Sequence, residues 1–129
     1  TMSECKLFAP GNLRATADNP GFASLVDYWT ANRYQLRYTG GMVSDVTQLL
    51  VKGGGVFVTP ASPGSRARLR LLYEAIPMAF LIEKAGGASS NGESSLLDLI
   101  VTDADDRTQV ALGSPGEVAR FDEMVGPMV

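Results

Sequence analysis

Three arginines stand at alternate positions shortly before a glutamate, since Arg66, Arg68 and Arg70 precede Glu74. Alternate side chains of a strand share one face, so this spacing places the guanidinium groups together. Glu74 then places a carboxylate at the start of the helix that follows. Arginine forks suit phosphate oxygens, and a nearby carboxylate suits a divalent cation that neutralises the same phosphate. Surface ion pairs, with a glutamate that favours a helix N-terminus, are the alternative explanation of the same spacing.

A pair of glycines marks a second candidate anion site in residues 37–42, which run RYTGGM. The alternating, β-prone residues 34–38 predict a strand, and helical spacing begins soon after the glycines. Free backbone N–H groups at such a junction bind anions. A glycine turn that holds no ligand is the alternative.

Several other chemistries are excluded by residue type or spacing. The chain has no histidine and one cysteine, Cys5, so a histidine-based triad, a zinc site and an internal disulfide are ruled out. Gly53-Gly54-Gly55 lacks the lysine and hydroxyl residue of a phosphate-binding P-loop, so it predicts a helix end. The spacing of Asp103, Asp105 and Asp106 does not fit a calcium-binding EF-hand loop and predicts a solvated loop.

The composition predicts one soluble domain. The chain has 129 residues, 45% of them hydrophobic and 19% charged, with a net charge of −3. This balance supplies a core and gives no general attraction for nucleic acid or anionic membranes. No apolar run approaches the roughly 20 residues that span a bilayer, and the first residues do not resemble a signal peptide. We therefore expect neither a nucleic-acid partner nor a membrane partner.

The periodicity of apolar residues predicts alternating short helices and strands. An amphipathic helix is expected from Pro20, with a core-facing Trp29, and residues 6–12 are expected to form a loop. Ser114 and Glu117 have the spacing of a capping box at the start of the last helix. Further helices are expected over 43–50 and, buried on all sides, over 75–85; strands are expected over 34–38, 56–59, 68–71 and 110–112. We predict an α/β fold with four or five short strands.

Several long stretches resemble the C-terminal half of the fructose-1,6-bisphosphatase family. They are LRYTGGMVSDV at 36–46, LRLLYE at 69–74, PMA at 77–79 and EKAGG at 83–87, in that order. KLFAPGNLRAT at 6–16 and DDRTQVA at 105–111 are closer to the sedoheptulose-1,7-bisphosphatase branch of this family. The resemblance covers essentially the whole chain, and it implies a layered α/β domain in which helices cover a small mixed sheet.

The resemblance implies a role for each matching residue. Asn12, Tyr38 and Arg68 would contact the phosphate that is not transferred, and Arg37 would reach it from a neighbouring subunit of a homodimer or homotetramer. Backbone groups around the glycine pair and at Leu69 would hold sugar hydroxyls, with Arg70 near the reacting end. Glu74 would bind Mg²⁺, and no catalytic residue is expected in this chain. The implied substrate-binding set is Asn12, Arg37, Tyr38, Thr39, Gly40, Gly41, Met42, Thr59, Arg68, Leu69 and Arg70.

Two departures bear on the sugar that is bound. Thr59 stands where fructose bisphosphatases generally have a tyrosine, and Arg68 stands where a lysine is usual. A smaller residue makes room for a seven-carbon sugar, and arginine replaces a point charge with a bidentate fork. The sequence leaves open whether the substrate is sedoheptulose 1,7-bisphosphate or fructose 1,6-bisphosphate.

The chain has no counterpart of the segment Asp-Pro-Leu-Asp-Gly-Ser, which supplies most metal ligands in the family. One glutamate does not assemble a magnesium site, which needs several oxygen ligands. We therefore expect residues 1–129 to be a C-terminal sugar-phosphate-binding domain that lacks its N-terminal metal-binding domain and is inactive alone. A non-catalytic sugar-phosphate-binding or assembly module and an inositol-phosphatase-like protein are the alternatives. The resemblance leaves the compartment open between a plastid and the cytoplasm.

Overall fold

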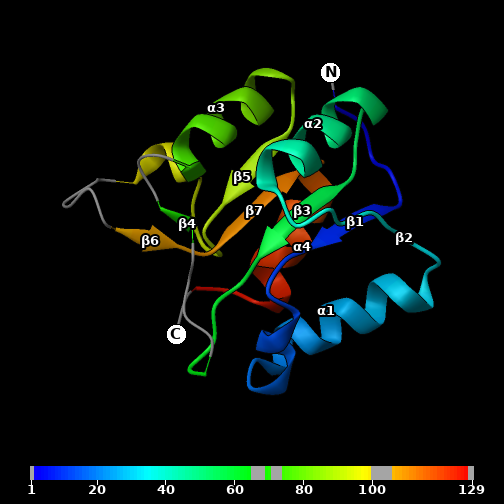
Figure 1. Ribbon diagram of the computed structural model, residues 1–129, viewed down its shortest axis with the longest axis vertical. Coiled ribbons are helices and arrows are strands. Elements are labelled where there is room, and N and C mark those ends of the chain that lie inside the picture. Colours follow the sequence, from blue (N-terminus) through cyan, green and yellow to red (C-terminus); the bar gives the residue numbers. More distant parts are fainter. Residues whose placement is uncertain (1, 65–68, 71–73, 100–105, 128–129) are drawn as a thin grey trace.

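A computed structural model describes residues 2–64, 69–70, 74–99 and 106–127 (Figure 1). Its main sheet has five strands in the order β2-β1-β3-β7-β5. β1 pairs in parallel with β2 and β3, whereas β7 is antiparallel to β3 and β5. The predicted small mixed sheet is therefore confirmed. Its strands are β1 (Leu7–Pro10), β2 (Gln35–Leu36), β3 (Val56–Thr59), β5 (Ala88–Ser90) and β7 (Val110–Gly113).

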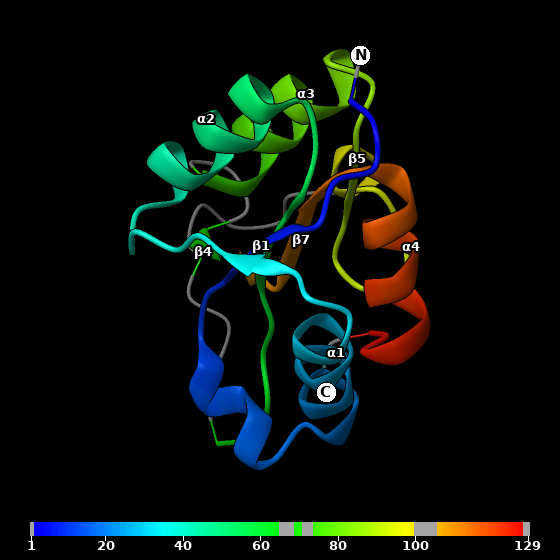
Figure 2. The same ribbon diagram turned by 90° about the vertical axis from the view of Figure 1, so that its right-hand side faces the viewer.

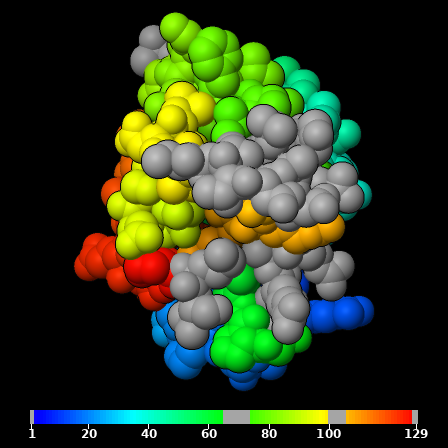
Figure 3. Space-filling model, turned by 90° about the vertical axis from the view of Figure 1, so that its left-hand side faces the viewer, coloured from blue at the N-terminus to red at the C-terminus, as the bar shows by residue number. Residues whose placement is uncertain are grey.

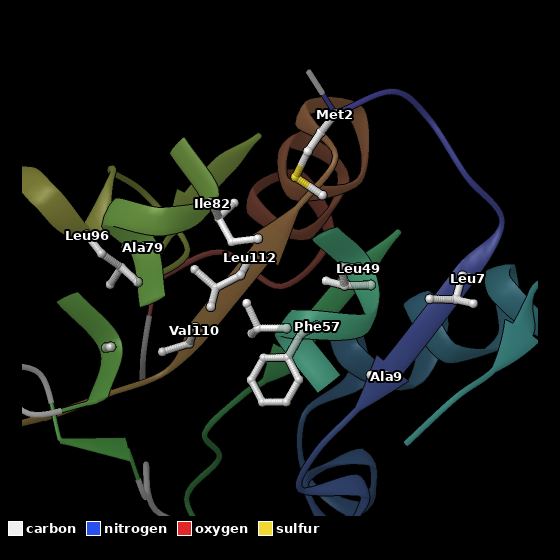
Figure 4. Packing of buried hydrophobic residues seen from close by; sticks show 12 residues of the cluster. Met2, Leu7, Ala9, Leu49, Phe57, Ala79, Ile82, Leu96, Val110 and Leu112 are labelled. Atoms are coloured by element: carbon white, nitrogen blue, oxygen red, sulfur yellow. The ribbon is translucent and has the colours of Figure 1, made fainter. Parts of the chain in front are cut away.

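Two helices cover each face of this sheet, as the side view in Figure 2 shows. Successive residues of a strand point to opposite faces, so each buried strand contributes to both layers. In β3, Phe57 packs toward the α2 and α3 side, whereas Val56 and Val58 pack toward α1 and α4. Figure 4 shows the first of these two cores, in which Phe57 lies near Val110 and Leu112 of β7. The helices are α1 (Pro20–Ala31), α2 (Met42–Lys52), α3 (Ile76–Lys84) and α4 (Pro115–Met124).

The smaller elements lie at the margins of the sheet. β4 (Leu69–Arg70) pairs antiparallel with β6 (Arg107–Thr108) in a separate two-stranded sheet. Short 3-10 helices occur at Leu13–Ala17 (η1) and Leu96–Asp98 (η3). On the face in Figure 3, the yellow segment around β5 and η3 lies between α3 and the red C-terminal helix. No helix among the described residues is long and apolar enough to cross a membrane.

The predicted loop over residues 6–12 is wrong, because most of it forms β1. All four residues of β1 are buried, and they pair with strands on both sides. Pro10 is tolerated because it ends the strand, where the ladder needs no further donor from it. The sequence signal was masked because a four-residue strand that is buried on both faces has no alternation to detect.

Helix α1 starts as predicted, and its start is fixed by a cap. The Asn19 side chain accepts a hydrogen bond from Phe22 N at 3.1 Å, and Pro20 occupies the first helical turn. Trp29 is fully buried together with Phe22 and Leu25, so the predicted amphipathic helix with a core-facing Trp29 is confirmed. Helix α2 also ends as predicted, at Gly53, whose φ of 79° lies in the left-handed region that favours glycine.

The predicted capping box of the last helix is wrong, although the helix itself is present. The Ser114 hydroxyl donates to Ser3 O at 2.6 Å and accepts from Gly55 N at 2.8 Å, so it does not cap the helix. The Glu117 carboxylate turns instead to Trp29 and Tyr34. The Ser114 hydroxyl and the Glu117 carboxylate thus bond to residues distant in sequence and do not form the capping box that their spacing predicts.

Helix α3 is buried on one side only, which corrects the prediction of a helix buried all round. Ala79 and Ile82 are inaccessible, whereas Phe80 is 50% exposed and Leu81 is 47% exposed. A nearly uniform apolar composition does not show which face meets the sheet, so the prediction overestimated the burial. The Lys84 ammonium lies 5.4 Å from the centroid of the Phe80 ring.

Candidate functional site

A cavity of about 500 Å³ opens at one edge of the main sheet. The residues that follow β1, Gly11 to Arg14, form one wall. Phe57 and Thr59 of β3 line its base, and Tyr38, Gly40 and Met42 approach from the segment that begins α2. β1 and β3 are parallel, so their carboxyl ends meet at this edge, which is where open α/β sheets generally bind ligands.

The first wall is fixed to the end of β3 by hydrogen bonds. Gly11 N donates to Val58 O at 2.7 Å, and Asn12 Nδ2 donates to Pro60 O at 2.7 Å. Asn12 has a left-handed backbone with φ of 55°, a conformation that asparagine tolerates better than most residues. A Cβ at Gly11 would lie 3.2 Å from Thr59 Oγ1, so glycine permits the close approach of the two segments.

The second wall is the glycine junction between β2 and α2. Arg37 N donates to Phe8 O at 2.9 Å, which fixes the start of the segment to β1. Gly40 has φ of 92°, a left-handed conformation that strains other residues. The Thr39 hydroxyl accepts from Gly41 N at 3.2 Å and closes the turn. The junction thus holds the Tyr38 side chain, which is 47% exposed, at the mouth of the cavity.

Asp45 anchors this second wall, a role that the sequence did not reveal. Its carboxylate is 1% exposed, and Oδ1 accepts from Thr39 N at 2.9 Å. The other oxygen, Oδ2, is buried and has no hydrogen-bond partner among the residues that the structure describes. A carboxylate in the first turn of a helix is favoured by the helix dipole, which offsets part of the cost of burial. The contact between Asp45 and Thr39 therefore holds the glycine junction against the start of α2.

The structure brings several of the predicted substrate-binding residues to this one cavity. The residues that line it are Asn12, Tyr38, Gly40, Met42 and Thr59. Thr39 and Gly41 belong to the same junction without lining the cavity, and the exposed Arg37 precedes it.

The predicted arginine strand is only partly described. Leu69 and Arg70 form β4, and their backbones pair with Thr108 and Arg107. Arg66 and Arg68 lie outside the described residues, so their prediction is not tested. The side-chain positions of Leu69 and Arg70 are likewise outside what the structure describes.

The metal-binding prediction rests on Glu74, a half-buried residue just before α3. The described residues contain no group of three or more histidine, cysteine, aspartate or glutamate side chains that would hold a metal ion. A magnesium ion requires near-octahedral oxygen coordination, with waters and phosphate often completing it. The described residues do not fit a complete magnesium site, and Glu74 supplies one carboxylate at most.

Sequence reasoning did not select Gly11, Leu13, Arg14 or Phe57 as cavity residues. Residues 11 and 12 lie in the predicted loop over 6–12, and no element is predicted for residues 13 and 14. Nothing in their own pattern shows that β1 brings them beside the distant start of α2. The only signal was the resemblance over 6–16, which includes Arg14 without giving it a role.

Comparisons with known proteins extend this picture to the whole chain. Residues 1–126 match the family model described as fructose-1-6-bisphosphatase, C-terminal domain. The chain is 54% identical over 123 residues to a chloroplastic sedoheptulose-1,7-bisphosphatase of Triticum aestivum, covering 95% of this chain and 31% of the relative. It is 42% identical over 120 residues to a class 1 fructose-1,6-bisphosphatase of Pelobacter propionicus, covering 92% and 37%.

A crystal structure of a putative sedoheptulose-1,7-bisphosphatase from Toxoplasma gondii has the same fold, with a TM-score of 0.93 and 44% identity. That match covers 95% of this chain and 40% of the other. The chain thus spans about a third of the length of the first curated relatives that it matches. Its sequence and fold together show that the chain belongs to the family of fructose-1,6-bisphosphatase C-terminal domains.

Proposed function

We propose that this chain is the sugar-phosphate-binding part of a phosphatase that removes the 1-phosphate of a ketose bisphosphate. The observation that carries the proposal is the cavity, in which Asn12, Tyr38 and Thr59 meet although they are distant in sequence. Its volume of about 500 Å³ is within the range of small-molecule sites, roughly 300–1,000 Å³. The names of the relatives, sedoheptulose-1,7- and fructose-1,6-bisphosphatases, supply the substrate class.

In this proposal, Asn12 and Tyr38 contact the phosphate that is not hydrolysed, together with Arg68. Arg37 is exposed and does not line the cavity of its own chain, which supports a role in trans within a homodimer or homotetramer.

The backbone of Gly40, Gly41 and Met42 holds sugar hydroxyls, because a glycine junction lets a ligand approach peptide groups closely. Leu69 contributes its backbone in the same way. Arg70 lies toward the reacting end.

Seven-carbon sugars are the preferred substrates in this proposal. Thr59 is smaller than the tyrosine that is general in fructose bisphosphatases, and it lies on the base of the cavity. The relative named as a sedoheptulose bisphosphatase is also more similar, at 54% identity against 42%. The chloroplastic relatives make a plastid the compartment that we propose.

The chain does not catalyse hydrolysis by itself in this proposal. Glu74 is one candidate magnesium ligand, and the described residues offer no carboxylate cluster around it. A metal-binding domain outside this chain is therefore proposed as the source of the remaining ligands and of the catalytic groups.

Thermal unfolding with added sugar phosphates tests the binding proposal. A ligand of the native state raises the unfolding temperature by mass action. We expect sedoheptulose 7-phosphate to raise it more than fructose 6-phosphate, and unphosphorylated sedoheptulose to raise it little. A Tyr38→Ala variant should lose most of the shift, whereas Lys52→Ala, which removes an exposed charge at the far end of α2, should retain it. Equal shifts in both variants would place the ligand elsewhere.

A phosphate-release assay tests the catalytic part separately. Incubation of the chain with sedoheptulose 1,7-bisphosphate and Mg²⁺ should release no phosphate at enzymatic rates. Turnover by the chain alone would contradict the requirement for a second domain.

A non-catalytic sugar-phosphate-binding module is the second candidate, favoured by the lack of a metal cluster among the described residues. The gene decides between the two. A reading frame that continues upstream into an acidic metal-binding domain supports the phosphatase, and a frame without one supports the module.

A further inference from the structure

Arg14 is the only charged side chain among the described residues that line the cavity. The described lining includes the amide of Asn12 and the hydroxyls of Tyr38 and Thr59, and it includes no carboxylate. The whole chain carries a net charge of −3, so a described lining with one cation and no carboxylate differs from the average charge of the molecule. Such a site favours an anionic ligand over a neutral or cationic one.

Arg14 also has no competing partner in the part of the chain that the structure describes. Arg120 forms an ion pair with Glu117 at 2.7 Å on α4, on the opposite face of the sheet from α2, so that Glu117 is not a partner of Arg14. No described side chain accepts a hydrogen bond from Arg14, although many exposed arginines pair with a carboxylate. Its guanidinium is therefore available to a ligand without first breaking an internal contact.

The backbone around Arg14 is held on both sides. Asn12 is tied to Pro60 O at 2.7 Å, and Ala15 is fully buried in the core beneath α1. Ala15 N donates to Asn12 O at 3.0 Å, which closes the first turn of η1. These contacts fix the root of the Arg14 side chain at the cavity wall, and its length lets the guanidinium adjust to a bound group.

We propose that Arg14 binds the phosphate group of the sugar phosphate that occupies this cavity. The inference rests on the proposed function and adds to it a cation that the resemblance does not assign. The planar fork of arginine makes two parallel hydrogen bonds to phosphate oxygens, with Tyr38 and Asn12 as neighbours on the same cavity.

A consequence distinguishes Arg14 from Arg37. Arg14 lines the cavity of its own chain, whereas Arg37 does not. A single chain therefore has a cation for the phosphate before any partner subunit contributes one. Phosphate binding by the dissociated chain should depend on Arg14 and should be insensitive to Arg37.

Titration calorimetry with sedoheptulose 7-phosphate, inorganic phosphate and sedoheptulose tests the proposal. At protein concentrations where sedimentation shows a single chain, we expect Arg14→Ala to raise the Kd for sedoheptulose 7-phosphate at least tenfold. Arg14→Lys should fall between this variant and the native chain, because it keeps the charge and loses the fork. Lys52→Ala matches the change in net charge away from the cavity and should alter the Kd less than twofold. Weak binding of unphosphorylated sedoheptulose should be the same in all variants.

Each outcome bears on one proposal. If the native chain binds sedoheptulose 7-phosphate and Arg14→Ala behaves like Lys52→Ala, the Arg14 proposal is overturned and the proposed function stands. If Arg37→Ala weakens binding by the single chain and Arg14→Ala does not, Arg37 of the same chain holds the phosphate instead, and the Arg14 proposal is again overturned. If the native chain binds no sugar phosphate at millimolar concentration, the proposed function itself fails.

Discussion

Replacing Glu117 by alanine should destabilise the domain more than any other single loss of a carboxylate on α4. Glu117 is 2% exposed and accepts hydrogen bonds from Trp29 Nε1 at 3.3 Å, from Arg120 Nη1 at 2.7 Å and from the Tyr34 hydroxyl. The Trp29 and Tyr34 rings pack on Phe8 of β1, the strand that leads into the cavity wall. The carboxylate thus joins α4 to α1 and to the sheet edge that carries the proposed site.

The expected loss follows from what happens to each donor. Trp29 is fully buried, so its N–H group would have no water to replace the lost acceptor, which costs about 1–3 kcal/mol. The Arg120 side chain is 29% exposed and can turn to solvent, so its pair adds at most about 1 kcal/mol. Tyr34 is half-buried, so the loss of its hydrogen bond to Glu117 adds a smaller amount to the free-energy cost. The sum is about 2–4 kcal/mol, a fall in Tm of roughly 10 °C for a domain of this size.

Chemical denaturation followed by the fluorescence of Trp29, the chain's one tryptophan, measures this loss directly. Glu123→Ala is the matched control, because Glu123 is an exposed carboxylate on the same helix, and it should change the free energy of unfolding by less than about 0.5 kcal/mol. A loss for Glu117→Ala below 1 kcal/mol, or equal to that of the control, would refute the account of a buried three-donor acceptor.

Three further predictions concern the same structure. Burial and the hydrogen bond to Glu117 raise the pKa of Tyr34 above its ordinary value of 10.0, so its contribution to stability is complete below pH 10 and is lost as the pH rises further. The Tm difference between the native chain and Tyr34→Phe should therefore shrink above pH 10, and a constant difference from pH 8 to 11 would contradict this. Gly40→Ala should cost about 1–2 kcal/mol in denaturant titrations, because φ is 92°. Gly41→Ala should cost little, because φ is −116° and its Cβ would make only ordinary van der Waals contacts; equal losses would rule out backbone strain as the cause. Thr59→Tyr should narrow the cavity and favour the shorter sugar. Calorimetry should show the ratio of the Kd values for sedoheptulose 7-phosphate and fructose 6-phosphate change by about tenfold toward fructose 6-phosphate. An unchanged ratio would show that Thr59 does not select the sugar.

Strong local signals predicted the elements best. The cap at Asn19 and the glycine at Gly53 act within a few residues, so the start of α1 and the end of α2 followed from spacing. The start of β1 and the true partners of Ser114 depend on segments far away in the chain. Ser114 contacts Ser3, and no pattern around Ser114 indicates that pairing.

The residues of the candidate site also divide into those that the sequence indicated and those that only the tertiary structure revealed. Family resemblance selected Asn12, Tyr38 and Thr59, and the structure brings them to one cavity. Asp45 and Arg14 were not selected, because their relevance arises from tertiary placement alone. Asp45 is not one of the apolar residues on which the prediction of that helix rested, and Arg14 lies beyond the predicted loop over 6–12, where no element was predicted.

The most direct test of the central claim is an NMR titration of the ¹⁵N-labelled chain with sedoheptulose 7-phosphate. We expect saturable amide shift changes that cluster in residues 11–14 and 38–42, the two walls of the cavity. Shift changes centred on another surface, or none at millimolar ligand, would contradict it.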